Sequence, residues 1–450
     1  MDQPSLFERL NAWARRSVTL KLFSIGILIL LLLISSTMIQ SLVYERQSIR
    51  ASAVEEVSSK WGREQTVAGP VITLPYLERR TNEKGQVELV KQYAHFLPDE
   101  LNVSGDLKTE ERHRGIHVVV LYTGKIRVQG RFKAPDIGSL GIAAADARPQ
   151  EASMMLGITD MKGIKGDINL RLNDTNYSFG PGLPAKDLFA SGASMPIRLT
   201  GDTTYTFDFT LDLNGSSALH FLPFGRTTSV TLKSPWASPS FEGYALPESR
   251  DVQTSGFTAT WKMTQLNRNY PQQGLGNFIG GNADEYSLAN QEAYAGFGVR
   301  LLLPVDHYTE TYRSVKYCLM FIVITFLTFF FVEILNKRRI HPIQYLLVGF
   351  AICLFYVLLL SISEHLNFGK SYLIACLAIL GLITYYVWHI FHNRKMTLVF
   401  SGLLALLYGF FYSLLQLEDY ALLLGSLGLF VILGTIMYLT RKVDWYAGRD

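Results

Sequence analysis

The chain has 450 residues, of which 48% are hydrophobic and 18% are charged, and its formal net charge is +4. A chain of this length predicts two or more folded units. The small net charge and the lack of a Lys/Arg run exclude the basic surface typical of nucleic-acid-binding proteins. Apolar residues gather in one N-terminal run and one long C-terminal block, which predicts a protein embedded in a lipid bilayer.

Six apolar runs reach the roughly 20 residues that span a bilayer core. The predicted order is a cytoplasmic N-terminus at 1–19, transmembrane helix 1 at 20–41, an exported domain at 42–313, transmembrane helices at 314–336, 343–363, 370–391, 396–416 and 420–440, and a cytoplasmic C-terminus at 441–450. No small-x-small cleavage site follows the first run, so we interpret it as an uncleaved anchor.

Basic residues between the runs predict the orientation, because Lys and Arg are enriched on the cytoplasmic side. Basic clusters lie at 15–21, 336–339, 392–395 and 441–442, whereas the intervening turns at 363–365 and 418–419 carry acidic residues and no Lys or Arg. The alternation predicts six helices with both termini in the cytoplasm and the long polar segment outside. It also places His341-Pro342 at the cytoplasmic start of the third helix, where proline sacrifices no helical hydrogen bond.

The polar segment is predicted to be rich in β-strands. Residues 205–214 (YTFDFTLDLN) alternate apolar and polar side chains without a break, which is the period of a half-buried strand. Shorter runs of the same kind predict antiparallel sheets with one solvated face. One helical exception opens the segment: Ile49, Ala53, Val57 and Trp61 recur at helical spacing, so we expect the first helix to continue as a stalk.

All three cysteines, Cys318, Cys353 and Cys376, lie in apolar runs, and we interpret them as packing residues. The exported domain has none, so it is expected to be stabilised by its own core without disulfides.

The sequence carries no recognised catalytic motif, so we predict no catalytic, cofactor or metal site. The stretch GLGNFIGG is one residue off the dinucleotide fingerprint, and the histidines form no spaced metal cluster. Ionisable residues avoid the middle of the apolar runs. Glu333, near one helix end, is expected to pair with Lys337 one turn later.

Two groups of polar residues flank the membrane at its outer face, and together they form our candidate site. Asp306, Arg313 and Lys316 lie in the link into the second helix, and Glu364 and His365 follow the third helix. Helices joined by a short loop pack as antiparallel neighbours, so the outer ends of these two should lie about 10 Å apart. The simplest explanation of these polar residues is that they are solvated at the ends of the helices. The sharper hypothesis is a corner that couples the exported domain to the helices, with a pH-responsive or ligand-binding role left open.

Several stretches together resemble the CreD family of bacterial inner-membrane proteins. The most specific is PVDHYTETYRSVKY with FLTFFFVE and RRIHPIQYLLVGFAICLFYVLLLSISEH, and the others are GPVITLPY, HFLPDELNVSGDL, RGIHVVVLYTGKIRVQGRF, SPWASPSFEGYALP and RKVDWYA. The resemblance covers nearly the whole chain. It implies a role in cell-envelope integrity and envelope stress responses, and it supplies no catalytic residue to transfer.

Two functions of different classes follow. The first is a non-enzymatic inner-membrane protein that supports envelope integrity through a periplasmic β-rich domain, with the lipid bilayer and other envelope proteins or components as partners. The alternative is a transporter or lipid-handling protein that uses the five C-terminal helices. A continuous cavity through these helices would favour the second.

Overall fold

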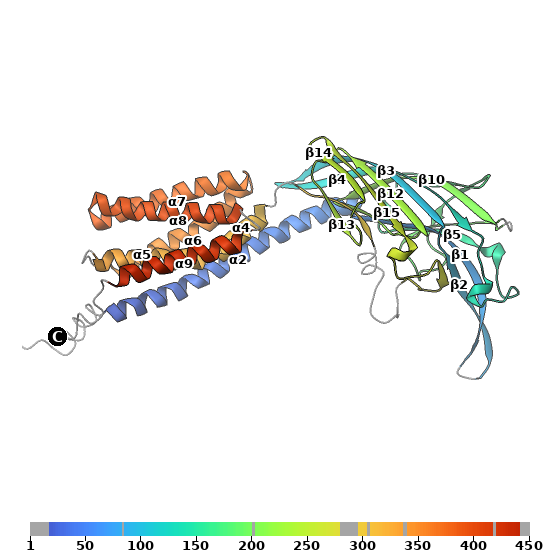
Figure 1. Ribbon diagram of the computed structural model, residues 1–450, viewed down its shortest axis with the longest axis horizontal. Helices are drawn as coiled ribbons and strands as arrows, with labels where there is room; N and C mark the ends of the chain where they lie inside the picture. Colours follow the sequence, from blue (N-terminus) through green and yellow to red (C-terminus); the bar gives the residue numbers. More distant parts are fainter. Residues whose placement is uncertain are drawn as a thin grey trace, which may run out of the picture. The chain divides into compact units, whose positions relative to one another are not determined.

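The computed structural model describes residues 18–82, 85–199, 203–279, 296–303, 307–335, 340–416 and 420–441. The chain divides into two compact units, a helical unit made of Met1–Arg50 with Val305–Asp450 and a β-rich unit made of Ala51–Pro304. Figure 1 shows the helices and strands of both. The prediction of a large β-rich part together with several long apolar helices is confirmed.

Seven α-helices are described along the chain. They are α2 (Val18–Trp61), α4 (His307–Lys316), α5 (Cys318–Leu335), α6 (Pro342–Ser363), α7 (Phe368–Phe391), α8 (Arg394–Gln416) and α9 (Ala421–Thr440). Helix α2 runs unbroken through the predicted anchor and on to Trp61, so the helical stalk expected from the spacing of Ile49 to Trp61 is confirmed.

The described residues contain four helices long and apolar enough to cross a membrane, within α2, α6, α7 and α8. Helices α4 and α5 count as a fifth span if the pair, bent by 44°, is taken as one. The described apolar part of α9, Leu422–Tyr438, is shorter than these. The six-helix count therefore stays a prediction, and the predicted single helix at 314–336 is broken between Lys316 and Cys318.

Helix α6 begins at Pro342, as the His-Pro pair predicts. The His341 backbone N–H donates to Gln344 Oε1 at 3.0 Å, and the Ile343 N–H donates to His341 Nδ1 at 3.4 Å. This reciprocal cap satisfies N–H groups that the first turn of a helix leaves without partners. Pro342 costs the helix no hydrogen bond, because a backbone N–H at this first position would have no intrahelical acceptor.

Aromatic rings fill the core of the helical unit. Phe321 lies 4.1 Å from Phe411 and 4.8 Å from Tyr408 between ring centroids, so α5 and α8 meet through these rings. Cys318, Cys353 and Cys376 are free and buried in the same helices, which confirms their interpretation as packing residues.

The β-rich unit contains two sheets. The strands are β1 (Gln65–Thr81), β2 (Val87–Phe96), β3 (Glu100–Arg114), β4 (His117–Lys133), β5 (Ser153–Ile158), β6 (Asn169–Leu172), β7 (Thr175–Ser178), β8 (Gly180–Pro181), β9 (Gly192–Pro196), β10 (Thr204–Ser216), β11 (Ala218–Phe221), β12 (Thr227–Ser234), β13 (Pro239–Gly243), β14 (Ser249–Gln253), β15 (Gly256–Thr264), β16 (Gln273–Leu275) and β17 (Phe297–Leu301). A nine-stranded sheet has the order β13-β17-β11-β1-β5-β9-β8, with β2 beside β1 and β16 beside β2. An eight-stranded sheet has the order β14-β15-β12-β3-β4-β10-β6-β7.

The pairings among described strands are antiparallel except for β1 with β11 and β3 with β12, which are parallel. Strand β10 follows its predicted alternation: Tyr205, Phe207 and Leu211 are buried, and Asp212 on the opposite face is exposed. A mainly antiparallel unit with one solvated face is therefore confirmed for the eight-stranded sheet. The two parallel pairs were not predicted.

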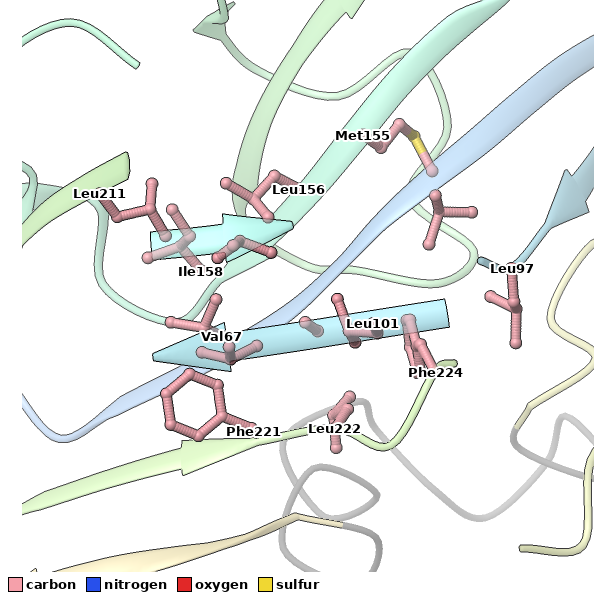
Figure 2. Packing of buried hydrophobic residues seen from close by; sticks show 14 of the residues in the cluster. Val67, Leu97, Leu101, Met155, Leu156, Ile158, Leu211, Phe221, Leu222 and Phe224 are labelled. Carbon is pink, nitrogen blue, oxygen red and sulfur yellow. The ribbon is translucent and has the colours of Figure 1, made fainter. Parts of the chain in front are cut away.

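Both sheets contribute to one hydrophobic core. Figure 2 shows Val67 of β1, Leu101 of β3, Ile158 of β5, Leu211 of β10 and Phe221 of β11 packed together. On β3 and β10 the buried side chains alternate with more exposed ones, whereas β5 is buried at every position. Each such buried side chain contributes roughly 1.5–3 kcal/mol relative to leaving it in water.

The last turns of α2, from Ala51 onward, belong to the β-rich unit. The indole of Trp61 donates from Nε1 to the Tyr122 carbonyl at 3.3 Å. The Arg112 guanidinium lies 4.5 Å from the centroid of the same ring, and Lys165 Nζ lies 5.2 Å from it. Two cations close to one tryptophan ring are favourable because the faces of the ring are electron-rich.

Candidate functional site

The structure places four of the five residues predicted for the corner. Arg313 and Lys316 lie in the last turn of α4, Glu364 ends α6 and is half-buried, and His365 is exposed in the turn after it. Asp306 lies outside the described residues. Helix α4 packs against α6. The link into the second predicted helix, which forms α4, and the end of the third predicted helix, α6, therefore belong to helices that pack against each other.

Helix α2 contributes side chains that contact α4 and α6 at this end of the helical unit. Arg46 Nε lies 3.8 Å from Glu364 Oε1. The hydroxyl of Tyr44 is hydrogen-bonded to that of Tyr312 in α4 at 2.5 Å, with the ring centroids 5.0 Å apart. We call Tyr44, Arg46, Tyr312, Lys316 and Glu364 the corner from here on.

Lys316 interacts with an aromatic ring in this arrangement. Its Nζ lies 4.6 Å from the centroid of Tyr312, a cation–π geometry. The guanidinium of Arg46 is 44% exposed and its ion pair is long, so that pair contributes at most about 1 kcal/mol. The corner can therefore bring α2, α4 and α6 together without being a main source of stability.

A second polar cluster, which we call the clamp, lies near the start of α6 and was missed by sequence reasoning. Glu333 of α5 is only 3% exposed and forms an ion pair with Lys21 of α2. It also accepts hydrogen bonds from Tyr345 Oη at 3.1 Å and from the Ile340 backbone N–H at 3.0 Å. Lys337, the partner expected from helical spacing, lies outside the described residues.

The clamp satisfies a carboxylate that burial alone would destabilise. A buried charge is costly unless an opposite charge and further donors accompany it. Here the donors come from three segments: the start of α2, the link before α6, and the second turn of α6. Glu333 therefore fixes the positions of these segments relative to α5. The sequence did hold a clue to this pair. In the predicted topology Lys21 lies at the cytoplasmic end of the first apolar run, and Glu333 lies near the cytoplasmic end of the second.

The β-rich unit carries a row of opposed charges across the solvated face of its eight-stranded sheet. Directly facing residues are Asp251 with Thr258, Thr258 with Lys233, Lys233 with Asp106, Asp106 with Lys125, and Lys125 with Asp212. We call Asp106, Lys125, Asp212, Lys233 and Asp251 the charged row. Residues that face each other across strands have Cβ atoms about 5 Å apart, so each cation of the row lies beside at least one carboxylate.

An open cleft of about 820 Å³ lies along the charged row, and all five of its residues line it. Lys108 on β3 adds a third cation, and Phe257 adds an apolar surface. Among the described residues, none of these six charged groups is in an ion pair within 4.0 Å. The cleft therefore presents three ammonium and three carboxylate groups that remain available to a polar or zwitterionic partner.

A buried hydroxyl–imidazole–carboxylate cluster lies in the other sheet. Thr73 Oγ1 is 2.9 Å from His95 Nδ1, and Asp187 Oδ2 is 2.8 Å from His95 Nε2. An ionised carboxylate only accepts, so His95 Nε2–H donates to Asp187. Thr73 and His95 are fully buried. Because burial closes the Thr73 hydroxyl to solvent, we interpret the cluster as a link between β1, β2 and the loop that carries Asp187.

Among the residues that the structure describes, no three His, Cys, Asp or Glu side chains are grouped so that they could hold a metal ion. The stretch GLGNFIGG, whose glycine spacing is close to that of a dinucleotide-binding motif, is described only as far as Ile279. Its first part is the short strand β16 and a turn beside β2, as a pairing of Gly274 with His95 shows.

Comparisons with known proteins agree over almost the full chain. The sequence model of the family described as "Inner membrane protein CreD" matches residues 17–446. The protein of that name from Escherichia coli (strain K12) is 32% identical over 425 residues, which is 93% of this chain and 92% of that protein. The range matched by the family model includes the corner, the clamp and the charged row.

Proposed function

This chain belongs to the family of the inner membrane protein CreD, and from that premise we propose that it is a non-enzymatic protein that supports cell-envelope integrity and the envelope stress response. In this proposal the β-rich unit lies in the periplasm and binds another envelope protein or a charged envelope component. The helical unit holds it at the bilayer. Both termini are cytoplasmic, as the distribution of basic residues suggests.

The charged row and its cleft carry the proposal. A solvated sheet face needs polar residues, but it does not need cations and carboxylates that alternate across four adjacent strands. Alternation of this kind favours a partner with a matching pattern and disfavours one that carries a single sign of charge. A protein segment or a peptide-bearing polymer offers both amino and carboxylate groups, so these are the partners that fit.

Complementation with altered cleft residues tests the proposed role. In a strain that lacks the chain and has an envelope defect, Lys125→Gln combined with Lys233→Gln should fail to restore resistance to bile salts while accumulating to the normal level. Lys262→Gln is the matched control, because Lys262 lies on the same sheet face in β15 and pairs with Glu248 outside the cleft. Full complementation by the double variant would reject the cleft as the functional surface.

Reporter fusions test the placement of the units. A periplasmic reporter joined at Glu418 or within the β-rich unit should be active, and one joined at Arg394 should be inactive. Equal activity at 394 and 418 would contradict the predicted orientation.

A further inference from the structure

An apolar groove lies within the helical unit along the side of α2 that faces α6. Its volume is about 800 Å³, and its walls come from α2, α6 and Leu382 of α7. Met38, Leu347 and Leu354 line it and are between 46% and 67% exposed. These helices are among those long enough to cross a membrane, so the groove is open toward the bilayer and not toward water.

The groove extends over more than half of a bilayer core. Its lining residues run from Ser35 to Glu45 on α2 and from Leu347 to Val357 on α6, and the two stretches are offset because Leu32 lies beside Gly349 and Arg46 beside Glu364. Together they cover roughly 22 Å along the helix axes, compared with a hydrocarbon thickness of about 30 Å. Near one end, Leu32 closes the seam between the helices by lying against Gly349. Beyond the other end, the seam is closed by Arg46 and Glu364.

A groove of this kind must be filled, because lining atoms that face a void lose their dispersion contacts and water is not a favourable occupant at this depth. A flexible hydrocarbon chain fits this elongated apolar shape. Its volume is within the range of ordinary small-molecule sites.

The charged end of the groove selects among lipids. Glu45 is the last lining residue on α2, and Arg46 follows it with a guanidinium that is 44% exposed. A carboxylate beside a guanidinium complements a headgroup that carries both an ammonium and a phosphate. An anionic headgroup without an ammonium would leave Glu45 next to a second negative charge.

We propose that the groove between α2 and α6 binds one acyl chain of a zwitterionic phospholipid with a primary ammonium headgroup, whose ammonium lies at Glu45 and whose phosphate lies at Arg46. Such a lipid becomes part of the contact between α2 and the other helices. This site shares no residue with the charged cleft, and the lipid proposal does not depend on the role proposed for that cleft.

Native mass spectrometry of the full chain in detergent tests the proposal with phosphatidylethanolamine and phosphatidylglycerol as probes. The wild type should retain one phosphatidylethanolamine in preference to phosphatidylglycerol. Met38→Trp, which fills the groove, should weaken retention about tenfold, since it displaces several methylene groups. Leu406→Trp, at an exposed position of α8 away from the groove, should have no effect.

Two further variants complete the test. Leu354→Trp fills the groove from α6 and should act like Met38→Trp, which guards against a folding defect in either one. Glu45→Gln should abolish the preference for phosphatidylethanolamine over phosphatidylglycerol while leaving total lipid binding largely intact. Equal binding by Met38→Trp and Leu406→Trp would mean annular lipid only and would overturn the proposal. A dimer that both groove variants disrupt would overturn it in favour of a helix from a second copy.

Discussion

Leu32 of α2 touches Gly349 of α6 so closely that a Cβ atom built on Gly349 would lie 2.2 Å from Leu32 Cδ1. The same added atom would lie 3.0 Å from Phe326 of α5. Leu32 and Phe326 are fully buried, so neither side chain can move into open space. Small residues allow this approach of membrane helices, which are held together mainly by packing.

We predict that Gly349→Ala destabilises the helical unit by about 1–3 kcal/mol, the usual cost of overpacking a core. Thermal unfolding of the purified protein in detergent measures this as a lower midpoint. Gly381→Ala in α7 is the control, since its added Cβ meets nothing within 4 Å. Both substitutions improve helix propensity, so only the steric effect separates them. Equal midpoints would contradict the contact.

The clamp predicts a graded response at Glu333. Glu333→Ala removes the acceptor of the Tyr345 hydroxyl and of the Ile340 N–H, and it leaves the Lys21 ammonium without its partner. We expect a loss of about 2–3 kcal/mol, moderated because Lys21 is partly exposed.

Glu333→Gln keeps one oxygen that can accept from the Ile340 N–H, and its NH2 group can donate to the Tyr345 hydroxyl oxygen, so the loss of stability should be clearly smaller than for Glu333→Ala. Thermal unfolding in detergent compares the two variants. If Gln and Ala at this position are equally damaging, the neutral hydrogen bonds do not contribute as described.

Cysteine crosslinking tests the corner. In a chain whose three native cysteines are replaced by alanine, Arg46→Cys with Glu364→Cys should be joined by a short bifunctional reagent, because the native side chains approach to 3.8 Å. Arg313→Cys with Glu364→Cys tests the hypothesis made from the sequence, and the packing of α4 on α6 leads us to expect crosslinking there too. Arg46→Cys with Arg394→Cys is the negative control. A product with the control and none with the other pairs would rule out the corner.

His220 should make the β-rich unit less stable in mild acid. Burial lowers the pKa of His220 from its usual 6.5, although Glu242 at 3.1 Å opposes the shift. Arg300, which is bound to both Glu242 and Glu64, adds to the lowering. The folded state thus binds the proton more weakly than the unfolded state. The contribution of this group to stability is complete above pH 6.5 and decreases as the pH falls below that value.

Denaturant unfolding of the wild type and of His220→Gln between pH 7.5 and 5 measures this contribution as a difference. The wild type should lose more stability than the variant across this range, by no more than about 1.4 kcal/mol per pH unit for one proton. Parallel pH profiles would show that His220 does not titrate differently in the two states.

Local pattern predicted those features that depend on neighbours in the chain. The alternation of residues 205–214 predicted strand β10 and its buried face, and the spacing of Ile49 to Trp61 predicted the extension of α2. The His-Pro pair marked the start of α6 because capping is a property of adjacent residues.

Long-range partners could not be found in the same way. Helical spacing suggested Lys337, which lies outside the described residues, as the partner of Glu333, but it could not reveal Lys21, which is 312 residues away in the chain. Arg46 was not connected with Glu364 for the same reason. The parallel pairs β1–β11 and β3–β12 join strands far apart in sequence, and alternation within a strand does not reveal which strand lies beside it.

The parallel pairing of β1 with β11 also sets an order of events during synthesis. Gln65 pairs with Leu219, and β11 in turn pairs with β17, which ends at Leu301. At roughly 5–20 residues per second, a ribosome needs on the order of 8–30 s to extend the chain from Gln65 of β1 to Leu219 of β11. During that interval β1 has an unsatisfied edge, even though its hairpin partner β2 is already available. The nascent β-rich unit should therefore depend on a holding chaperone for longer than a meander of equal size would.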